Sequence, residues 1–253
     1  GALMNARTDS YLGQVTGYLS TLTDDPARAV ALAKETMNHS APAKRIAQDA
    51  TPLPHSLVVY TMFSFYPIMA FAIVAISTLM TSLGRRSVHS RLIAAPVSSR
   101  SRSLGAIGAC LVIGLVGWLW IFGLGATALG ASAVTTSAPL LAIVGAALGA
   151  FMLFAVSLGF LLGQISPSQN VASAVANIGG LAMSFLSGAW VPTEWLPDAV
   201  VQAAKFTPGY WAAQAISGAY TATSMSADVI RPLLIDCGIC VLFAVAIFAV
   251  AMA

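Results

Sequence analysis

Two long stretches of this sequence contain no charged residue, and they flank one strongly basic segment. No Asp, Glu, Lys or Arg occurs in residues 50–84 or in residues 103–193. Between them, residues 85–102 (RRSVHSRLIAAPVSSRSR) carry five of the twelve Lys and Arg residues and no acidic residue. The chain is only 8% charged, whereas soluble domains are about 25% charged. We therefore expect an all-α membrane protein that crosses the bilayer several times.

Five membrane-spanning helices are predicted after residue 56. A bilayer core about 30 Å thick needs roughly 20 apolar residues at 1.5 Å per residue. Pro67 should kink the first span, because proline cannot donate the helical hydrogen bond. We expect spans at about 57–83, 104–131, 140–163, 171–190 and 229–253.

Residues 1–56 have a soluble composition, with five basic and five acidic side chains. Asp24-Asp25-Pro26 is typical of a helix start, and the helix should run from Ala27 to Met37. Prolines at 42, 52 and 54 then indicate a linker. The chain is therefore expected to consist of a small helical segment, residues 1–56, and a membrane domain, residues 57–253.

The distribution of Lys and Arg predicts the orientation. Basic loops are retained on the cytoplasmic side, which places residues 85–103 in the cytoplasm and residues 1–56 outside. The short loops predicted to lie outside carry one basic residue, Lys205. We expect a multi-pass protein of a bacterial plasma membrane.

Small residues recur along the third predicted span. Glycine at intervals of four lets helix backbones approach closely in a bilayer. This face is expected to pack against another helix, either within the chain or in a second subunit. Its glycines are Gly145, Gly149, Gly159 and Gly163.

Aromatic residues and prolines cluster between residues 185 and 218, before the last span. Trp and Tyr favour the membrane interface, and prolines interrupt helices there. The cluster predicts either an interfacial or re-entrant helical hairpin, or a loop with a short amphipathic helix. The candidate residues are Gly188, Pro192, Trp195, Pro197, Pro208 and Tyr210.

The last predicted span contains an acidic residue, Asp236, with Arg231 near its rim. An ionisable group at that depth costs about 2.5–3.5 kcal/mol on insertion scales, so it usually faces protein or water. Two interpretations remain open: a structural pair with Arg231, or a role in transport.

Several classes of function have no support in the sequence. No phosphate-binding loop, metalloprotease motif or nucleophile elbow occurs, so we expect neither an enzyme nor a cofactor bound by this chain. The basic segment has no interleaved aromatic residues, which argues against nucleic-acid binding. The three cysteines lie in apolar runs and are expected to be packing residues.

Two segments together resemble a known family. Residues 91–98 (RLIAAPVS) are similar to the R-L-x-x-x-P-V-S segment of ABC transporter type-2 permeases. Residues 186–211, with Leu-Ser-Gly, Pro192, Leu-Pro and Pro-Gly-Tyr, are similar to the stretch before that family's last helix. The sequence departs from the family at residues 87–90 (SVHS), where an acidic residue and Gly-Thr are often found.

The resemblance implies a six-helix permease, so we expect at least one membrane helix upstream of this sequence. It implies a homodimer or heterodimer of permeases, in contact with the lipid bilayer, that pairs with ATP-binding-cassette subunits. These subunits would bind the ATP and drive export. The loop that would contact the ATPase contains Arg86, Arg91, Leu92 and Pro96, and because Pro96 disfavours helical geometry before it, a short helix should span residues 86–94.

Two alternatives to an ATP-driven exporter stay open. One is a channel or an ion-gradient-driven transporter, in which Asp236 would be the ion-linked group. The other is a membrane scaffold or receptor that does not transport, with residues 1–56 as its interacting part.

Overall fold

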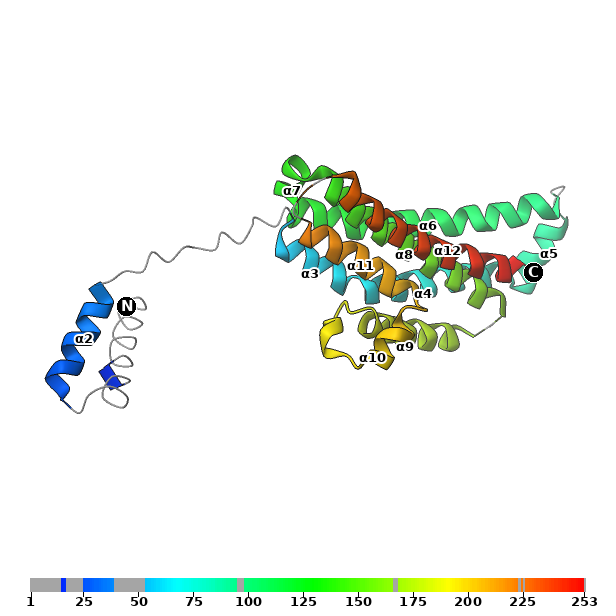
Figure 1. Ribbon diagram of the computed structural model, residues 1–253. Coiled ribbons are helices and arrows are strands. Elements are labelled where there is room, and N and C mark those ends of the chain that lie inside the picture. The colour runs from blue at the N-terminus through cyan, green and yellow to red at the C-terminus, as the bar shows by residue number, and fades with distance from the viewer. Residues whose placement is uncertain are drawn as a thin grey trace. The chain divides into compact units, whose positions relative to one another are not determined.

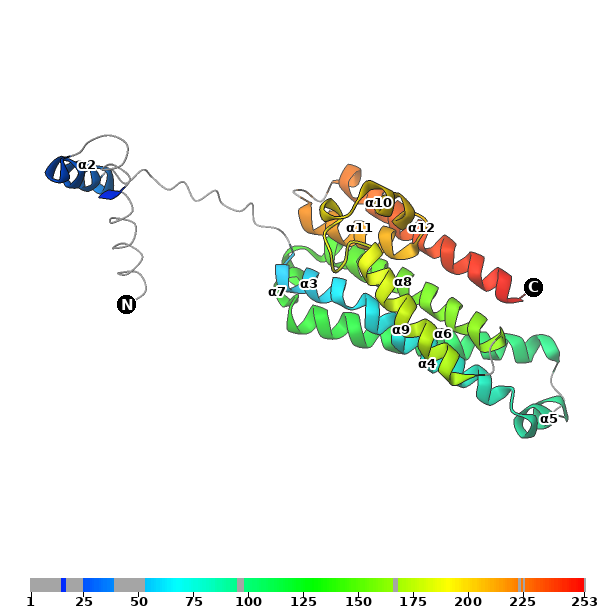
Figure 2. The same ribbon diagram turned by 90° about the horizontal axis from the view of Figure 1, so that it is seen from below.

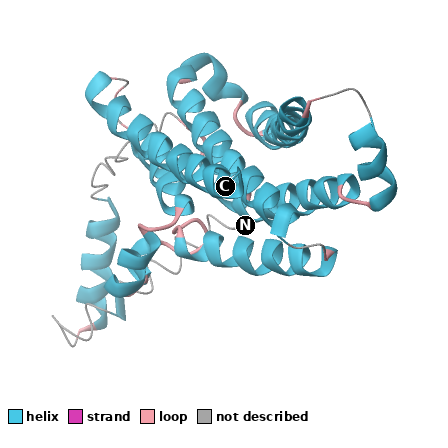
Figure 3. Ribbon diagram, turned by 90° about the vertical axis from the view of Figure 1, so that its right-hand side faces the viewer, coloured by secondary structure: helices cyan, strands magenta, loops and turns pink. Residues whose placement is uncertain are grey.

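The structure is a computed structural model that describes residues 15–16, 25–38, 53–94, 98–165, 168–222, 224 and 226–252. The chain divides into two compact units, residues 1–50 and residues 51–253, which are described separately. Within the described ranges, every regular element is a helix (Figures 1 and 3). The predicted all-α fold is confirmed.

The first unit contains helix α2 (Pro26–Asn38). Asp25 caps its start, since the Asp25 Oδ1 atom accepts a hydrogen bond of 2.9 Å from the Ala27 backbone N–H. Ala29 and Ala33 are buried on one face. The helix predicted from Ala27 to Met37 is confirmed, whereas most of the rest of the predicted segment 1–56 lies outside the described residues.

The second unit is a bundle of long helices joined by short connections. Its basic segment forms a separate short helix, and the connection between the second and third predicted spans contains another. The elements are α3 (His55–Phe63), α4 (Phe65–Leu83), α5 (Arg86–Ala94), α6 (Ser99–Ala128), α7 (Ala131–Thr136), α8 (Ala138–Ile165), α9 (Gln169–Leu186), η1 (Thr193–Trp195), α10 (Asp198–Ala204), α11 (Pro208–Thr221) and α12 (Ala227–Met252).

In the described part of the chain, four helical segments are long and apolar enough to cross a membrane: His55–Leu83, Ser101–Ala128, Ala138–Ile165 and Ala227–Met252. They correspond to the first, second, third and fifth predicted spans. The fourth, predicted at 171–190, is the 18-residue helix α9. It is more polar than the others, because it includes two asparagines and a glutamine, and it is not among the four.

The first span is interrupted between α3 and α4. Ser64 forms the turn, and its side-chain hydroxyl donates a 2.7 Å hydrogen bond to the Tyr60 carbonyl. Pro67 follows three residues later, and proline cannot donate to the carbonyl four residues before it. The interruption therefore lies one turn before Pro67, on the side of the residues whose helical bonding proline disturbs, while the kink itself stays a prediction.

Helix α8 lies at the centre of the bundle and packs against α4, α6, α11 and α12. Its Phe151 ring stacks on Phe65 of α4 with ring centroids 4.5 Å apart. Helix α6 is joined to its neighbours by two side chains. Tyr60 donates a 2.9 Å hydrogen bond to the Ile121 carbonyl, and the Trp118 indole N–H donates one of 2.9 Å to the Gly145 carbonyl.

Candidate functional site

The basic segment forms helix α5 at the end of the bundle opposite the start of α3 (Figure 1). Its bounds, Arg86–Ala94, are those predicted from the sequence, so this prediction is confirmed. The backbone N–H of Val88 donates to the Arg85 carbonyl at 2.9 Å and closes the first turn. Arg85, Arg86 and Val88 are exposed, which leaves a basic surface with an apolar side chain at this end.

Three further residues of the predicted ATPase-contact loop have no described side chains. Arg91 and Leu92 lie within α5, and Pro96 lies outside the described residues. After this gap, the Ser98 hydroxyl accepts a 3.2 Å hydrogen bond from the Ser101 backbone N–H and caps the start of α6.

Between α9 and α11 the chain turns through a short hairpin. Gly188 has a φ of +82°, a conformation that side chains rarely adopt. A Cβ atom at this position would lie 2.6 Å from Thr193 Cγ2, so glycine is required there for space as well. Two helices follow the turn: α10 and α11, the second of which packs against α8 and α12 inside the bundle.

Proline and aromatic residues define the ends of the hairpin helices. Pro197 precedes α10, and Pro208 begins α11 at the first helical position. The Trp211 indole N–H donates a 2.8 Å hydrogen bond to the Lys205 carbonyl and closes the connection between the two helices. The Tyr210 and Trp211 rings contact each other edge to face. The other two predicted residues, Pro192 and Trp195, lie at the exposed 3-10 turn before α10.

The hairpin turns beside a membrane-spanning helix and not beyond its end. The Trp190 ring stacks on Phe63, with centroids 5.4 Å apart. Phe63 lies eight positions after His55, or about 12 Å along the helix at 1.5 Å per residue. Helix α11 then returns toward the start of α3, where Tyr220 and His55 have ring centroids 5.8 Å apart. Both interpretations of this segment, a re-entrant hairpin and a loop with a short amphipathic helix, stay predictions.

Helix α9 is attached mainly to α4 (Figure 2). Two side-chain hydrogen bonds of 2.6 Å join the helices: Tyr66 donates to Asn177 Oδ1, and Gln169 Nε2 donates to Thr78 Oγ1. Along the buried side of α9, small residues let the backbones approach. The buried small residues are Ala172, Ala176, Gly180 and Ser184.

The opposite face of α9 is exposed and carries a regular stripe. Its members recur at alternating intervals of three and four, the spacing of a helix that pairs with another helix. Two asparagines, Asn170 and Asn177, are exposed beside the stripe. The stripe consists of Val171, Ala174, Ile178, Leu181 and Phe185.

Asp236 and Arg231 are not brought together. Asp236 is partly buried in α12, Arg231 is exposed, and no ion pair between these two described residues is formed. Helix neighbours are three or four residues apart, whereas these side chains are five apart and point in different directions. The structural pair considered from the sequence is therefore not found.

The predicted glycine face of α8 meets other helices of the same chain. Gly145 and Gly149 lie against Phe122 and Trp118 of α6. Gly159 and Gly163 lie against α4. Contacts within the chain thus occupy all four positions where a second subunit was considered.

No metal site is formed by the part of the chain that the structure describes, since no three His, Cys, Asp or Glu residues gather there. The three cysteines are buried and free.

The polar contacts between α4 and α9 were not predicted. Their signal in the sequence is Asn177 inside the fourth predicted span and Gln169 just before it. Polar side chains inside a membrane helix usually bond to another helix. That rule could have singled out Asn177, but the partners Tyr66 and Thr78 follow only from how the helices pack.

The sequence matches one family of known proteins over nearly its whole length. Residues 5–253 match the family described as ABC-2 family transporter protein. No curated protein and no solved structure matches the chain.

Proposed function

The chain belongs to the ABC-2 family of transporter proteins, and from this premise we propose that it is the permease subunit of an ATP-driven exporter. It pairs with a separate ATP-binding-cassette subunit and with a second permease chain, and the ATPase drives a substrate outward. Its location is the plasma membrane. Helix α5 faces the cytoplasm, because basic loops are retained there, and residues 1–56 lie on the other side.

Helix α5 is the proposed contact with the ATPase. It is a two-turn helix with exposed Arg86 and Val88. Arginine forms strong charge-assisted hydrogen bonds with carboxylates, and an amphipathic helix binds a groove through its apolar side. In this arrangement the arginines meet acidic groups of the partner, while Leu92 is buried in the contact.

The observation that carries the transport proposal is the turn from α9 to α11 beside Phe63. Irregular backbone at membrane depth is tolerated only where protein covers it or where it lines water. The exposed residues of this turn include Glu194, Asp198 and Lys205, which are unsuited to lipid. We therefore assign the transport path to this side of the molecule, between two copies that meet at α9.

Leu92→Asp tests the coupling role with all five arginines of the basic segment kept. Attraction to anionic lipid needs the arginines and not a leucine, whereas losing a hot-spot residue at the centre of a contact costs about 2 kcal/mol or more. We expect co-purification of the ATPase subunit with the full-length chain to fall about tenfold or more, since 1.4 kcal/mol is tenfold in affinity. Membrane abundance should stay unchanged.

Ser90→Asp is the matched control, because it adds the same charge to α5 two residues away, on another side of the helix. This variant should retain the ATPase and its ATP hydrolysis in proteoliposomes. If Leu92→Asp retains both as well, α5 only sets the orientation of the chain and the coupling proposal is wrong.

A further inference from the structure

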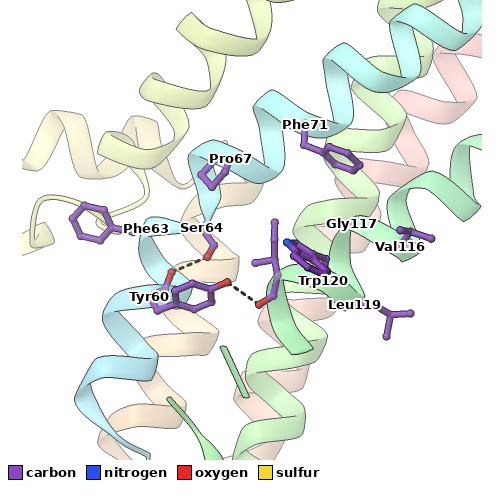
Figure 4. A pocket seen from close by; sticks show the side chains of 10 residues that line it. Tyr60, Phe63, Ser64, Pro67, Phe71, Val116, Gly117, Leu119 and Trp120 are labelled. Atoms are coloured by element: carbon purple, nitrogen blue, oxygen red, sulfur yellow. Dashed lines mark hydrogen bonds between the residues drawn. The ribbon is translucent and has the colours of Figure 1, made fainter. Parts of the chain in front are cut away.

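An apolar cleft of about 810 Å³ lies between the first span and α6 (Figure 4). One wall is formed by residues from Tyr60 to Phe71, at the interruption between α3 and α4. The other wall is formed by residues 116–121 of α6. Figure 4 shows Trp120 and Phe71 projecting into the space between the two helices.

The polar groups of the cleft are almost all used within the protein. Tyr60 donates its hydroxyl hydrogen to the Ile121 carbonyl at 2.9 Å, and Ser64 donates to the Tyr60 carbonyl at 2.7 Å. Apart from the indole N–H of the exposed Trp120, the other lining side chains are hydrocarbon. A ligand with several polar groups would find no partners here, so the walls suit a hydrocarbon.

One wall of the cleft has about the length of one leaflet of a bilayer, while the α6 wall, from Val116 to Ile121, is about 8 Å long. Phe71 follows Tyr60 by eleven positions, which is about 16 Å along a helix. Half of a hydrocarbon core about 30 Å thick is about 15 Å. A single hydrocarbon chain fits in a cleft of about 810 Å³.

The cleft is continuous with a face of α6 suited to lipid. Val112, Leu115 and Leu119 are exposed on this helix, and α6 is one of the four described segments able to cross a membrane. Lipid therefore reaches the mouth of the cleft without crossing protein. We propose that the cleft holds one acyl chain of a bilayer lipid, from the leaflet on the side where α3 begins.

The consequence of this assignment is a lipid bound at the interruption of the first span. The acyl chain would pack against Pro67 and Phe71, in the half of the span where proline weakens helical bonding. The proposal requires that the protein spans a membrane, which its family supports. It does not depend on ATPase coupling or on the direction of transport.

Val116→Trp tests the proposal by filling the cleft, and Val112→Trp is the matched control. The two valines lie one turn apart on α6 and are 58% and 59% exposed, but only Val116 lines the cleft. The full chain is placed in vesicles of phosphatidylethanolamine and phosphatidylglycerol, extracted in mild detergent, and examined by native mass spectrometry. We expect wild type and Val112→Trp to retain about one more lipid per chain than Val116→Trp.

Thermal unfolding of each variant shows whether it is folded, and Leu119→Trp provides a second filling variant, since Leu119 also lines the cleft. Equal lipid retention by a folded filling variant and by Val112→Trp would overturn the proposal.

A second measurement determines which way the acyl chain runs within the cleft. Lipids that carry a photoreactive diazirine near the headgroup or at the chain end are crosslinked, and the labelled peptides are mapped. The first probe should label near Tyr60 and Ile121, and the second near Phe71 and Val116. The same pattern from both probes, or the reverse order, would contradict the assigned leaflet.

Discussion

Gly159 of α8 contacts backbone atoms of α4, which cannot move aside as a side chain can. A Cβ atom there would lie 3.1 Å from the Ala72 carbonyl oxygen and from Ile73 Cα. Gly159→Leu should therefore separate α8 from α4 and destabilise the protein by about 3 kcal/mol, the upper end of the usual cost of overpacking. Gly123→Leu is the control, because nothing lies within 4 Å of that position. Thermal unfolding and size-exclusion chromatography of both variants in detergent check the prediction.

If Gly159→Leu and Gly123→Leu unfold at the same temperature, α8 and α4 are not in close contact at Gly159. Both variants replace a glycine in a long membrane helix by leucine. A difference in their unfolding temperatures therefore reports the contact at Gly159 and not the loss of a glycine.

Individual contacts could be predicted only in part. The spacing of glycines in residues 145–163 indicated a packing face, because small residues allow close approach. It did not indicate that Gly145 meets α6 while Gly159 meets α4, since that depends on how three helices are arranged. An ion pair between Asp236 and Arg231 is disfavoured within one helix, because side chains five positions apart point in different directions.

At the scale of elements, α9 is the helix whose exposed stripe needs a partner. In the proposed dimer the two α9 helices meet along this stripe, so Ile178→Cys should form a disulfide between copies on mild oxidation. Leu242→Cys on α12 is the control, with the same apolar character and similar exposure, 66% against 70% for Ile178. The three native cysteines are buried and are replaced by alanine. Non-reducing electrophoresis of membranes should show a dimer only for Ile178→Cys.

A dimer band of equal intensity for both cysteine variants would mean random collision in the membrane. Crosslinking at Leu242 alone would place α12, and not α9, at the subunit contact.

Most elements follow from simple rules of composition. Long uncharged runs predicted the spans, and Pro96 predicted the end of α5, because the residue before proline disfavours helix. The end of α9 was not predictable in the same way. The apolar run continues to Trp190, but the helix ends at Leu186, where the Ser187 hydroxyl and the positive φ of Gly188 begin the turn.

At the scale of the whole molecule, the basic helix α5 and the hairpin should be reached from opposite sides of the membrane. Ser87 of α5 and Glu194 of the hairpin are both exposed, so cysteine at either position costs little in packing. An impermeant thiol reagent added to intact cells should label Glu194→Cys and not Ser87→Cys. After the cells are opened, both should react. Labelling of Ser87→Cys from outside would reverse the proposed orientation.

The polar composition of α9 has a consequence for how the chain enters the bilayer during synthesis. Asn177 is unfavourable in lipid without a hydrogen-bond partner, yet it bonds to α4 in the folded protein. Helix α4 leaves the ribosome first, so its Tyr66 is already in the membrane when α9 arrives. Insertion of α9 by the translocon is thus expected to depend on α4, an earlier segment of the nascent chain.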